Sequence, residues 1–424
     1  MRLTKSSLTK RGLFRYIPPL SSVFLAISGV GFYTTFVSLY FANLNYNNIV
    51  IGVVQTSYFF GLLLGAYKCE QFVRRIGHIQ VLAASGGLLA ATTLMQALTV
   101  NLLLWVVTRV LSGMATAAFY VVIECWMLDH AHNKHRGRLL SMYMISLSCG
   151  YAFGQLLLHR IYDLNNGHAF IFASLLYALS VLPIALSTRK LTTPTSKHQI
   201  CFLSLAKAAP FGTMGSLVSG FSISALYSFL ALVPTASGAH GENFVGCMMI
   251  GGLVAQWPIG KCSDLFDRRK VLLALCLSTL VLYVIFVWNS GHSEPFLYLL
   301  TFCIGASVLT LYPLSVAQVI DRLQSQHLAS ATGCMLLIYS VGCTVGPLLA
   351  SMMIQMTTDG SGLFLYLLIV MGFACVVGIS SMLNKPSIPQ QQQEDFVSLP
   401  RTTSLVYGLD PRVEASETDS QASV

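Results

Sequence analysis

Two ionisable residues, Arg109 and Glu124, lie inside long apolar stretches of the sequence. A charge in hydrocarbon costs at least about 2.5–3.5 kcal/mol, so such residues are candidates for function. On one helix the two are roughly 22 Å apart and cannot pair with each other. The Arg109 guanidinium keeps its proton and can bind a substrate anion or tune a nearby acid, whereas Glu124 can carry a coupled proton. The structural alternatives are a brace for Arg109 and a gate or interfacial anchor for Glu124.

Polar and aromatic residues recur in the apolar stretches, where they can line a central cavity that binds substrate. These candidates are Tyr33, Gln55, Tyr58, Tyr120, Tyr227, Gln256, Tyr312 and Tyr339. Phenol and amide groups with few charges favour a neutral or amphipathic organic substrate over a strongly charged one. Each of these side chains can equally bridge two helices by hydrogen bonds.

A short histidine-rich segment offers a metal site as an alternative. It supplies carboxylate and imidazole groups, which are common metal ligands, from Asp129, His130, His132 and His135. Two basic residues are interleaved with these groups in an expected wet loop, which disfavours a bound metal cation. The sequence also lacks a phosphate-binding loop of the Walker A type, which excludes nucleotide hydrolysis. It therefore predicts no enzyme activity, no cofactor and no metal.

The composition shows what kind of protein must position these residues. Of 424 residues, 54% are hydrophobic and only 10% are charged, and the mean hydropathy is +0.67. Soluble domains have roughly 25% charged residues. This balance excludes a soluble enzyme or a nucleic-acid-binding protein, despite a net charge of +9. It predicts a membrane protein that contacts the lipid bilayer and no nucleic acid.

Long apolar runs predict an all-α polytopic fold. About 20 apolar residues cross the roughly 30 Å of hydrocarbon in a bilayer, and they must be helical because backbone groups in lipid can bond only to each other. We expect 12 transmembrane helices, at residues 16–42, 47–68, 79–99, 102–127, 139–160, 168–188, 210–235, 243–262, 271–288, 294–320, 328–356 and 361–383.

The basic residues predict the orientation in the membrane. All but Arg109 and Arg160 of the 25 Lys and Arg residues lie at the two ends of the chain or in and beside loops that follow even-numbered runs. Loops rich in Lys and Arg are cytoplasmic. Both termini are therefore predicted to be cytoplasmic.

A faint internal repeat predicts two halves. Gly150 and Gly154 in the fifth run recur as Gly342 and Gly346 in the eleventh, at a constant offset of 192 residues. Such duplication is common in transporters.

The repeat defines the expected domain organisation. Residues 1–188 form an N-terminal six-helix half, residues 189–209 a cytoplasmic linker and residues 210–383 a C-terminal six-helix half. Residues 384–424 contain a run of Gln and several Ser and Thr but no spanning run, so we expect a disordered cytoplasmic tail there.

Two motifs resemble those of the major facilitator superfamily. Gly260-Lys261-Cys262-Ser263-Asp264-Leu265-Phe266-Asp267-Arg268-Arg269-Lys270 is similar to the family's signature loop, and Arg109-Val110-Leu111-Ser112-Gly113 to its helix-four motif. The resemblance implies a conformational latch at cytoplasmic helix ends, formed by Gly260, Asp264, Arg268, Arg269, Arg74, Arg75 and Gly77. The first-half loop departs from the pattern because it has no Asp at the expected place.

Finer details are similar to a poorly characterised branch of bacterial inner-membrane facilitators, including Glu124-Cys125-Trp126 and Gln256-Trp257-Pro258. The resemblance implies a monomeric secondary transporter with two pseudo-symmetric halves. It would move a small organic molecule across the cell inner membrane by alternating access, with protons as the coupling ion. The glycine pattern of the fifth run favours export by an antiporter over import. The alternatives are a non-transporting membrane sensor or scaffold and a metal-binding membrane protein.

Overall fold

A computed structural model describes residues 16–130, 136–161, 166–186, 202–233, 241–288, 294–323, 328–357, 361–384 and 393–410. Within these ranges the chain is helical, and twelve of its helices have 20 residues or more. The predicted all-α fold is therefore confirmed.

The long helices form two consecutive groups of six. The first group is α2 (Ile17–Asn43), α3 (Asn48–Ile76), α4 (His78–Leu98), α5 (Leu102–His130), α6 (Arg136–Ile161) and α7 (Asn166–Ala185). The second group is α9 (Pro210–Phe229), α10 (Gly241–Leu265), α11 (Arg268–Trp288), α12 (Glu294–Ile320), α13 (Leu328–Met356) and α14 (Gly362–Asn384). Three short helices complete the described chain, α8 (Phe202–Ala208), η3 (Leu230–Leu232) and η6 (Ser404–Leu409).

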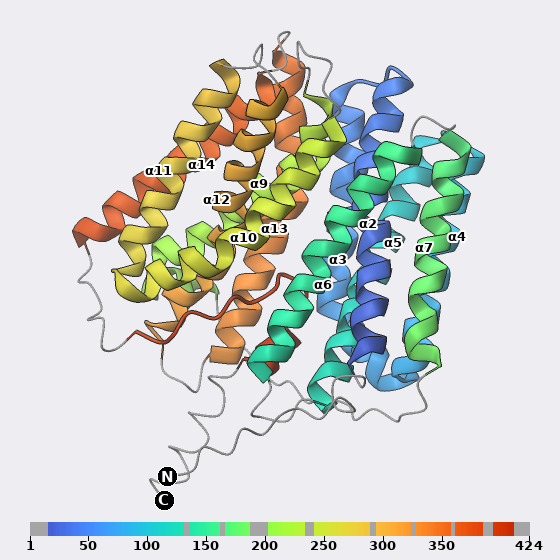
Figure 1. Cartoon of the computed structure of the whole chain (residues 1–424), viewed down its shortest axis with the longest axis horizontal. Coiled ribbons are helices and arrows are strands. Elements are labelled where there is room, and N and C mark those ends of the chain that lie inside the picture. Colours follow the sequence, from blue (N-terminus) through green and yellow to red (C-terminus); the bar gives the residue numbers. More distant parts are fainter. Residues whose placement is uncertain are drawn as a thin grey trace, which may run out of the picture.

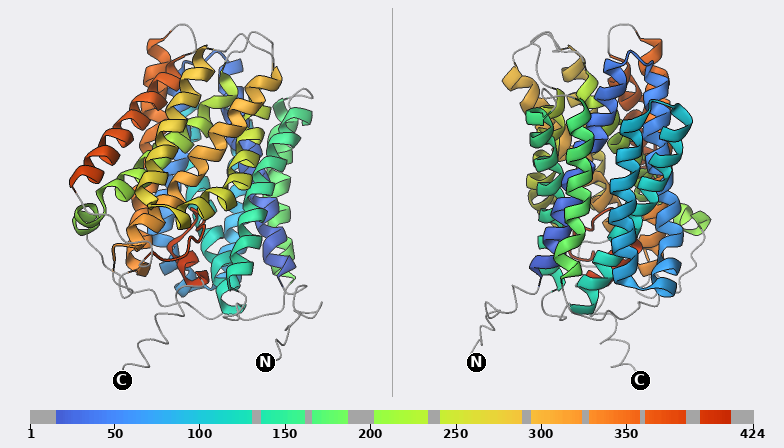
Figure 2. Two further views of the ribbon diagram at one scale, coloured as in Figure 1. Left: turned by 60° about the vertical axis from the view of Figure 1, so that its left-hand side comes forward. Right: turned by 90° about the vertical axis from the view of Figure 1, so that its right-hand side faces the viewer.

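The two groups stand side by side as two helical bundles (Figures 1 and 2). They meet mainly where α3 packs on α13 and where α6 packs on α10. We call the end of the molecule at which α2 begins the entry end, and the end at which α2 finishes the far end. A solute that passes between the groups would move from one of these ends to the other.

Ten of the twelve long helices are long and apolar enough to cross a membrane, among the residues that the structure describes. The two that fall short are α6 and α10, which face each other between the halves. Both carry polar and charged residues, including Arg138 and His159 in α6 and Glu242 and Lys261 in α10. A helix that borders a cavity needs less apolar surface than one surrounded by lipid, so the count of twelve spanning helices stays a prediction.

Helix α3 extends beyond its predicted boundary. The apolar run ends near Lys68, but the helix continues to Ile76 and carries Arg74 and Arg75 in its last turn. Cations are favourable at this position because they face the negative end of the helix dipole. Gly77 then ends the helix with φ at 103°, a conformation that glycine adopts at little cost. Hydropathy marks the hydrocarbon core, whereas the cap marks the end of the helix.

The repeated glycines make equivalent contacts in the two halves. Gly150 and Gly154 of α6 lie against the α2 backbone, and Gly342 and Gly346 of α13 lie against the α9 backbone. Small residues allow helices in lipid to approach closely. A duplication would produce two groups of six helices with such paired contacts, and the division of the chain into two related halves stays a prediction.

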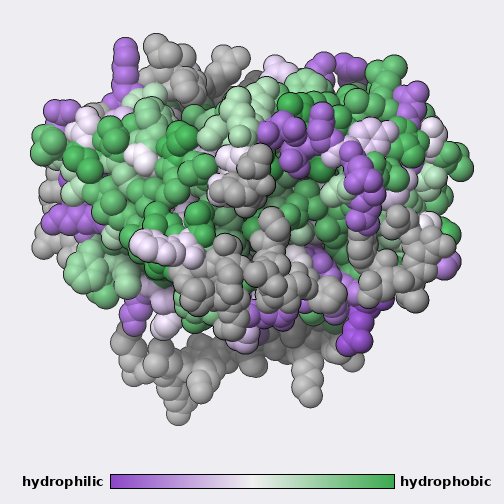
Figure 3. Space-filling model, turned by 90° about the horizontal axis from the view of Figure 1, so that it is seen from above, coloured by the Kyte–Doolittle hydropathy of each residue, from purple (hydrophilic) through white to green (hydrophobic). Residues whose placement is uncertain are grey.

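The outer surface of the bundle carries many large apolar side chains. Exposed examples include Leu98, Leu103, Ile171 and Trp288. Viewed from the far end, hydrophobic side chains reach the outline of the molecule on several sides (Figure 3). Such a surface fits a surrounding bilayer.

The C-terminal segment, residues 393–410, corrects the expectation of a disordered tail. It enters between the halves at the entry end and finishes in η6 (Figure 1). Leu399, Leu405, Val406 and Leu409 are buried, and η6 contacts α5, α6 and α13. The polar composition suggested disorder, but a few apolar residues within it find a partner surface on both halves. The rest of the predicted tail lies outside the described residues.

Candidate functional site

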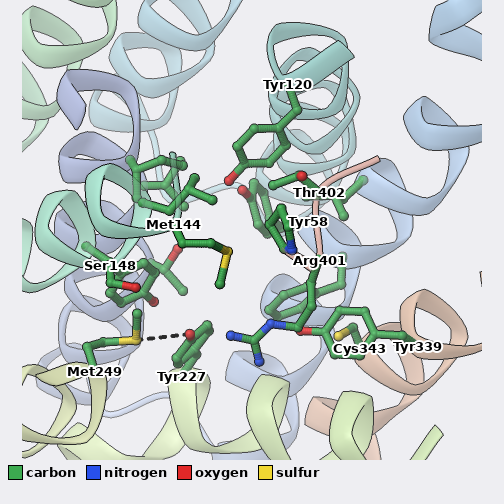
Figure 4. Close-up of a pocket in the computed structure, with 18 of the residues that line it drawn as sticks. Tyr58, Tyr120, Met144, Ser148, Tyr227, Met249, Tyr339, Cys343, Arg401 and Thr402 are labelled. Atoms are coloured by element: carbon green, nitrogen blue, oxygen red, sulfur yellow. Dashed lines mark hydrogen bonds between the residues drawn. The ribbon is translucent and has the colours of Figure 1, made fainter. Parts of the chain in front are cut away.

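A cavity of about 140 Å³ lies between the two halves. Its wall is formed mainly by aromatic, methionine and aliphatic side chains (Figure 4). Among the lining residues are Tyr58, Tyr120, Met144, Ser148, Tyr151, Tyr227, Met249, Gln256, Tyr339 and Cys343, with Pro400, Arg401 and Thr402 from the C-terminal segment. A wall of this kind suits an organic molecule with apolar surface.

Contacts between the halves close the far end of the molecule. His159 Nδ1 of α6 is 3.0 Å from Glu242 Oε1 of α10, and Gly52 of α3 lies against Ser351 of α13. The rings of Tyr151 and Tyr227 stack between α6 and α9 with their centroids 4.7 Å apart.

At the entry end the halves are separated by the C-terminal segment. A second cleft of about 640 Å³ lies there between α6 and α10 and shares Met144 and Gln256 with the cavity wall. Phe396, Val397 and Ser398 form part of this cleft. The C-terminal segment therefore lies between the cavity and the entry end, because its residues line both spaces.

The structure places five of the eight predicted cavity residues in the wall, Tyr58, Tyr120, Tyr227, Gln256 and Tyr339. The other three lie behind it. Tyr33 donates a hydrogen bond to Gln96, Gln55 bonds to α2 and α5, and the Tyr312 ring packs on that of Tyr339 at 5.0 Å. Each of these three side chains contacts a neighbouring helix, as the helix-bridging alternative describes.

Arg109 is buried behind the cavity wall, with 1% of its surface exposed. Its Nη2 donates to Gln55 Oε1 at 2.8 Å, and Gln55 in turn donates to Thr34 O and Ser38 Oγ of α2. The guanidinium carbon lies 4.7 Å from the centre of the Tyr58 ring. This network connects α5 to α3 and α2, which is the arrangement expected of a brace.

Glu124 is fully buried beside the cavity. Its carboxylate accepts a hydrogen bond from the Tyr143 hydroxyl at 2.8 Å, and further ones from Thr402 and Thr403 of the C-terminal segment. All three of these donors are hydroxyl groups. Burial disfavours the charged carboxylate, whereas three hydroxyl donors favour it.

The predicted latch residues of α10 and α11 form an ionic cluster at the entry end. Arg268 Nη1 pairs with Asp321 Oδ1 at 2.6 Å, and Arg268 Nη2 pairs with Asp264 Oδ1 at 3.0 Å. Arg269 pairs with Asp267 at 3.1 Å. Arg268 of α11 forms charge-assisted hydrogen bonds to two different carboxylates. It therefore joins three helices, because Asp264 belongs to α10 and Asp321 directly follows α12.

This ionic cluster also holds the C-terminal segment. Asp264 Oδ1 accepts from Phe396 N at 2.8 Å, and Arg268 donates to Glu394 O. The Phe396 ring lies over Gly260, where a side chain would collide with it. The contact adds the C-terminal segment to the helix ends that the predicted latch joins. Arg74, Arg75 and Gly77 surround the equivalent turn of the first half.

Sequence reasoning missed several residues of the wall. Met144, Ser148 and Tyr151 follow one another at intervals of four and three along α6. That spacing places them on one face of a helix, so it could have identified them together. Arg401 and Thr402 carry no such signal, because a coil segment has no periodicity.

The metal alternative receives no support from the residues that the structure describes, where His, Cys, Asp and Glu form no ligand group of three or more. His132 and His135 of the predicted cluster lie outside the described residues.

Comparisons with known proteins agree with this architecture. Residues 20–244 and 211–406 match the family model described as Major Facilitator Superfamily. An uncharacterized MFS-type transporter of Enterobacter sp. strain 638 is 27% identical over 366 residues, which cover 83% of this chain and 94% of that protein. The uncharacterized MFS-type transporter YcaD of Escherichia fergusonii is 28% identical over the same coverage of both chains.

Two solved structures share the fold. A mutant of the nucleoside transporter NupG aligns with a TM-score of 0.73 and 16% identity, over 87% of this chain and 99% of that one. A bacterial homolog of the human lysosomal transporter Spinster, in an inward-facing and unoccupied conformation, aligns with a TM-score of 0.63 and 11% identity, over 96% of this chain and 98% of that one.

Proposed function

The chain belongs to the major facilitator superfamily, and on this premise we propose that it is a secondary active transporter that moves a small organic solute by alternating access. The membrane would be the bacterial inner membrane, with twelve spanning helices, both termini in the cytoplasm and the monomer as the working unit. The entry end would then be the cytoplasmic end. Bacterial relatives support the choice of membrane, and the distribution of basic residues supports this orientation.

The observation that carries the proposal is a cavity between two six-helix halves whose helices contact each other directly at the far end, whereas the C-terminal segment lies between them at the entry end. The far end is sealed by the His159–Glu242 contact and by α3 against α13. The entry end is separated by the C-terminal segment and the cleft beside it. Alternating access requires a binding site between related halves. Because the halves contact each other at the far end and the entry end is the proposed cytoplasmic end, we interpret this arrangement as an inward-facing state.

The lining supports an amphipathic organic solute. Tyrosine and methionine side chains dominate the cavity wall, and methionine adapts to apolar ligands of varied shape. We propose proton coupling with Glu124 as the carrier and Arg109 as a brace that holds the wall in place. The glycine pattern of α6 favours export over import. Export driven by protons that move inward would make the protein an antiporter. Asp264 and Arg268 would act as a latch that changes partners during the cycle.

A ligand screen tests the function. We expect amphipathic organic compounds to raise the melting temperature of the detergent-solubilised protein, because a ligand that binds the folded state stabilises it by mass action. Compounds that do so should then exchange across proteoliposomes that contain the protein, and not across protein-free vesicles. A ligand that binds but never crosses the vesicle membrane would support the sensor alternative.

Cysteine labelling tests the topology. In a variant whose 11 native cysteines are replaced, Asn47→Cys should react with a membrane-impermeant thiol reagent added to intact cells, and Arg138→Cys should not. Both positions are exposed, Asn47 at the far end and Arg138 at the entry end. Detergent permeabilisation should make Arg138→Cys reactive. Labelling of Arg138→Cys in intact cells would reverse the proposed orientation.

A further inference from the structure

We propose that Tyr227 and Tyr339, the latter supported from behind by Tyr312, form a site for the guanidinium or ammonium group of a small organic cation. In this structure Arg401 of the chain's own C-terminal segment fills that site. The inference rests on the proposed function, since it assigns the chemical class of the transported solute. It also makes the C-terminal segment a tethered competitor of the substrate.

The placement of Arg401 is the first observation. Its side chain reaches from the C-terminal segment into the cavity and points toward Tyr227, with Tyr339 and Cys343 beside it (Figure 4). The guanidinium carbon lies 5.9 Å from the centre of the Tyr339 ring, and Tyr227 lines the same cavity. Arginine over an aromatic face at this distance is a cation–π contact.

The chemistry of the wall is the second observation. The Tyr227 hydroxyl donates to Met249 Sδ at 3.1 Å, which leaves its phenolic oxygen able to accept hydrogen bonds. The Tyr339 ring presents its π face to the guanidinium and packs on the Tyr312 ring behind it, with centroids 5.0 Å apart. Phenol oxygens and ring faces are acceptors, so the group that suits them is a donor with positive charge.

The third observation is that Arg401 lacks some of the hydrogen bonds and the counterion that a buried guanidinium group needs. Its Nη1 atom is buried and has no hydrogen-bond partner within the described part of the chain, and no carboxylate there forms an ion pair with it. A buried cation without a counterion loses hydration that aromatic contacts only partly replace. Arg401 is therefore displaceable, and a free cation with a better fit can take its place.

The segment that delivers Arg401 is anchored on both sides of it. Thr402 and Thr403 donate to Glu124, Ser398 donates to Gln256 at 3.2 Å, and Phe396 N donates to Asp264. A tethered group competes at a high effective concentration. Free cations should accordingly bind the intact protein more weakly than a variant whose tethered cation is removed.

The experiment uses phenethylguanidinium as the probe and the uncharged phenethylurea as its matched analogue. Binding is measured by titration calorimetry on the full-length protein in detergent. In Arg401→Gln, which keeps a planar polar group but removes the charge, we expect phenethylguanidinium to bind at least tenfold more tightly than in the wild type. Phenethylurea should bind at least tenfold more weakly than the cation to the same variant.

Four further variants separate this site from general effects. Arg401→Lys keeps a tethered cation, so this variant should bind the probe as weakly as the wild type. Arg138→Gln, which removes an exposed charge on α6, should leave the wild-type affinity unchanged. In the Arg401→Gln background, Tyr339→Phe should retain the probe affinity within about threefold, because the ring remains, and Tyr339→Leu should lose at least tenfold.

Equal affinities for the cation and the urea would overturn the inference, as would equal probe affinities in the wild type and Arg401→Gln. Loss of probe binding in Tyr339→Phe together with Tyr339→Leu would also overturn it, because the π face would then not be the recognised feature. The proposed function is tested separately by flux through proteoliposomes. A transported solute that is uncharged and unaffected by phenethylguanidinium would leave the transporter standing and reject the cation site. Tight cation binding without any flux would support the cation site and reject the proposed transport function.

Discussion

Glu124→Gln should abolish accumulation of substrate driven by an imposed proton gradient, while exchange of substrate between equal concentrations continues. Glutamine has nearly the same shape as glutamate but cannot titrate. Glu124 is a fully buried carboxyl group in α5, beside the cavity. An uncompensated charge in hydrocarbon is costly. We therefore expect this buried carboxyl group to hold a proton while its access changes from one face of the membrane to the other. The measurement is uptake of a ligand identified by the screen, in proteoliposomes with and without a pH difference.

The control for this prediction comes from the hydroxyl partners of Glu124. The substitution also removes one acceptor from Thr403, which would loosen the C-terminal segment irrespective of proton coupling. Thr403→Val removes that hydrogen bond and keeps both the carboxyl and the side-chain shape. It should preserve gradient-driven accumulation. Unaltered pH-driven accumulation in Glu124→Gln would show that another group carries the proton or that transport is not proton-coupled.

The helices and their order could be predicted because the bilayer imposes a simple rule on the sequence. The predicted runs 16–42 and 294–320 differ by no more than one residue at either end from α2 and α12. Hydropathy was less informative where a helix leaves the hydrocarbon, as at the end of α3, or borders the cavity, as in α6 and α10. There the boundary depends on capping and on the facing helix, which no single run contains.

The candidate site was predictable only in part, for a physical reason. Tyr58, Tyr227 and Tyr339 could be chosen because a polar aromatic group in an apolar helix needs a partner or a cavity. Whether that need is met by a cavity or by a neighbouring helix depends on contacts between distant segments, and Tyr33 found Gln96. The role of Arg401 depends on a coil segment that reaches across both halves, and local sequence does not encode this.

Gly305→Ala should strongly destabilise the folded protein, whereas Gly372→Ala should be neutral or slightly stabilising. A Cβ atom on Gly305 of α12 would lie 1.9 Å from the carbonyl oxygen of Met248 in α10, and one on Gly372 of α14 would meet nothing within 4 Å. The clash at Gly305 is with backbone, so the two helices must separate, and overpacking of this kind costs about 1–3 kcal/mol or more. At Gly372 the substitution only replaces a poor helix former with a better one.

The pair is measured as melting temperature and as yield of monodisperse protein in detergent. Gly305→Ala should lower both, with a loss of several degrees in melting temperature, and Gly372→Ala should lower neither. Helix α10 carries Gln256 and α12 carries Tyr312, so separation of these helices should also weaken phenethylguanidinium binding in the Arg401→Gln background. A stable Gly305→Ala variant with unchanged binding would mean that α10 and α12 do not pack closely in the membrane. In that case the wall that contains Gln256, and the packing of Tyr312 behind Tyr339, would need a different geometry.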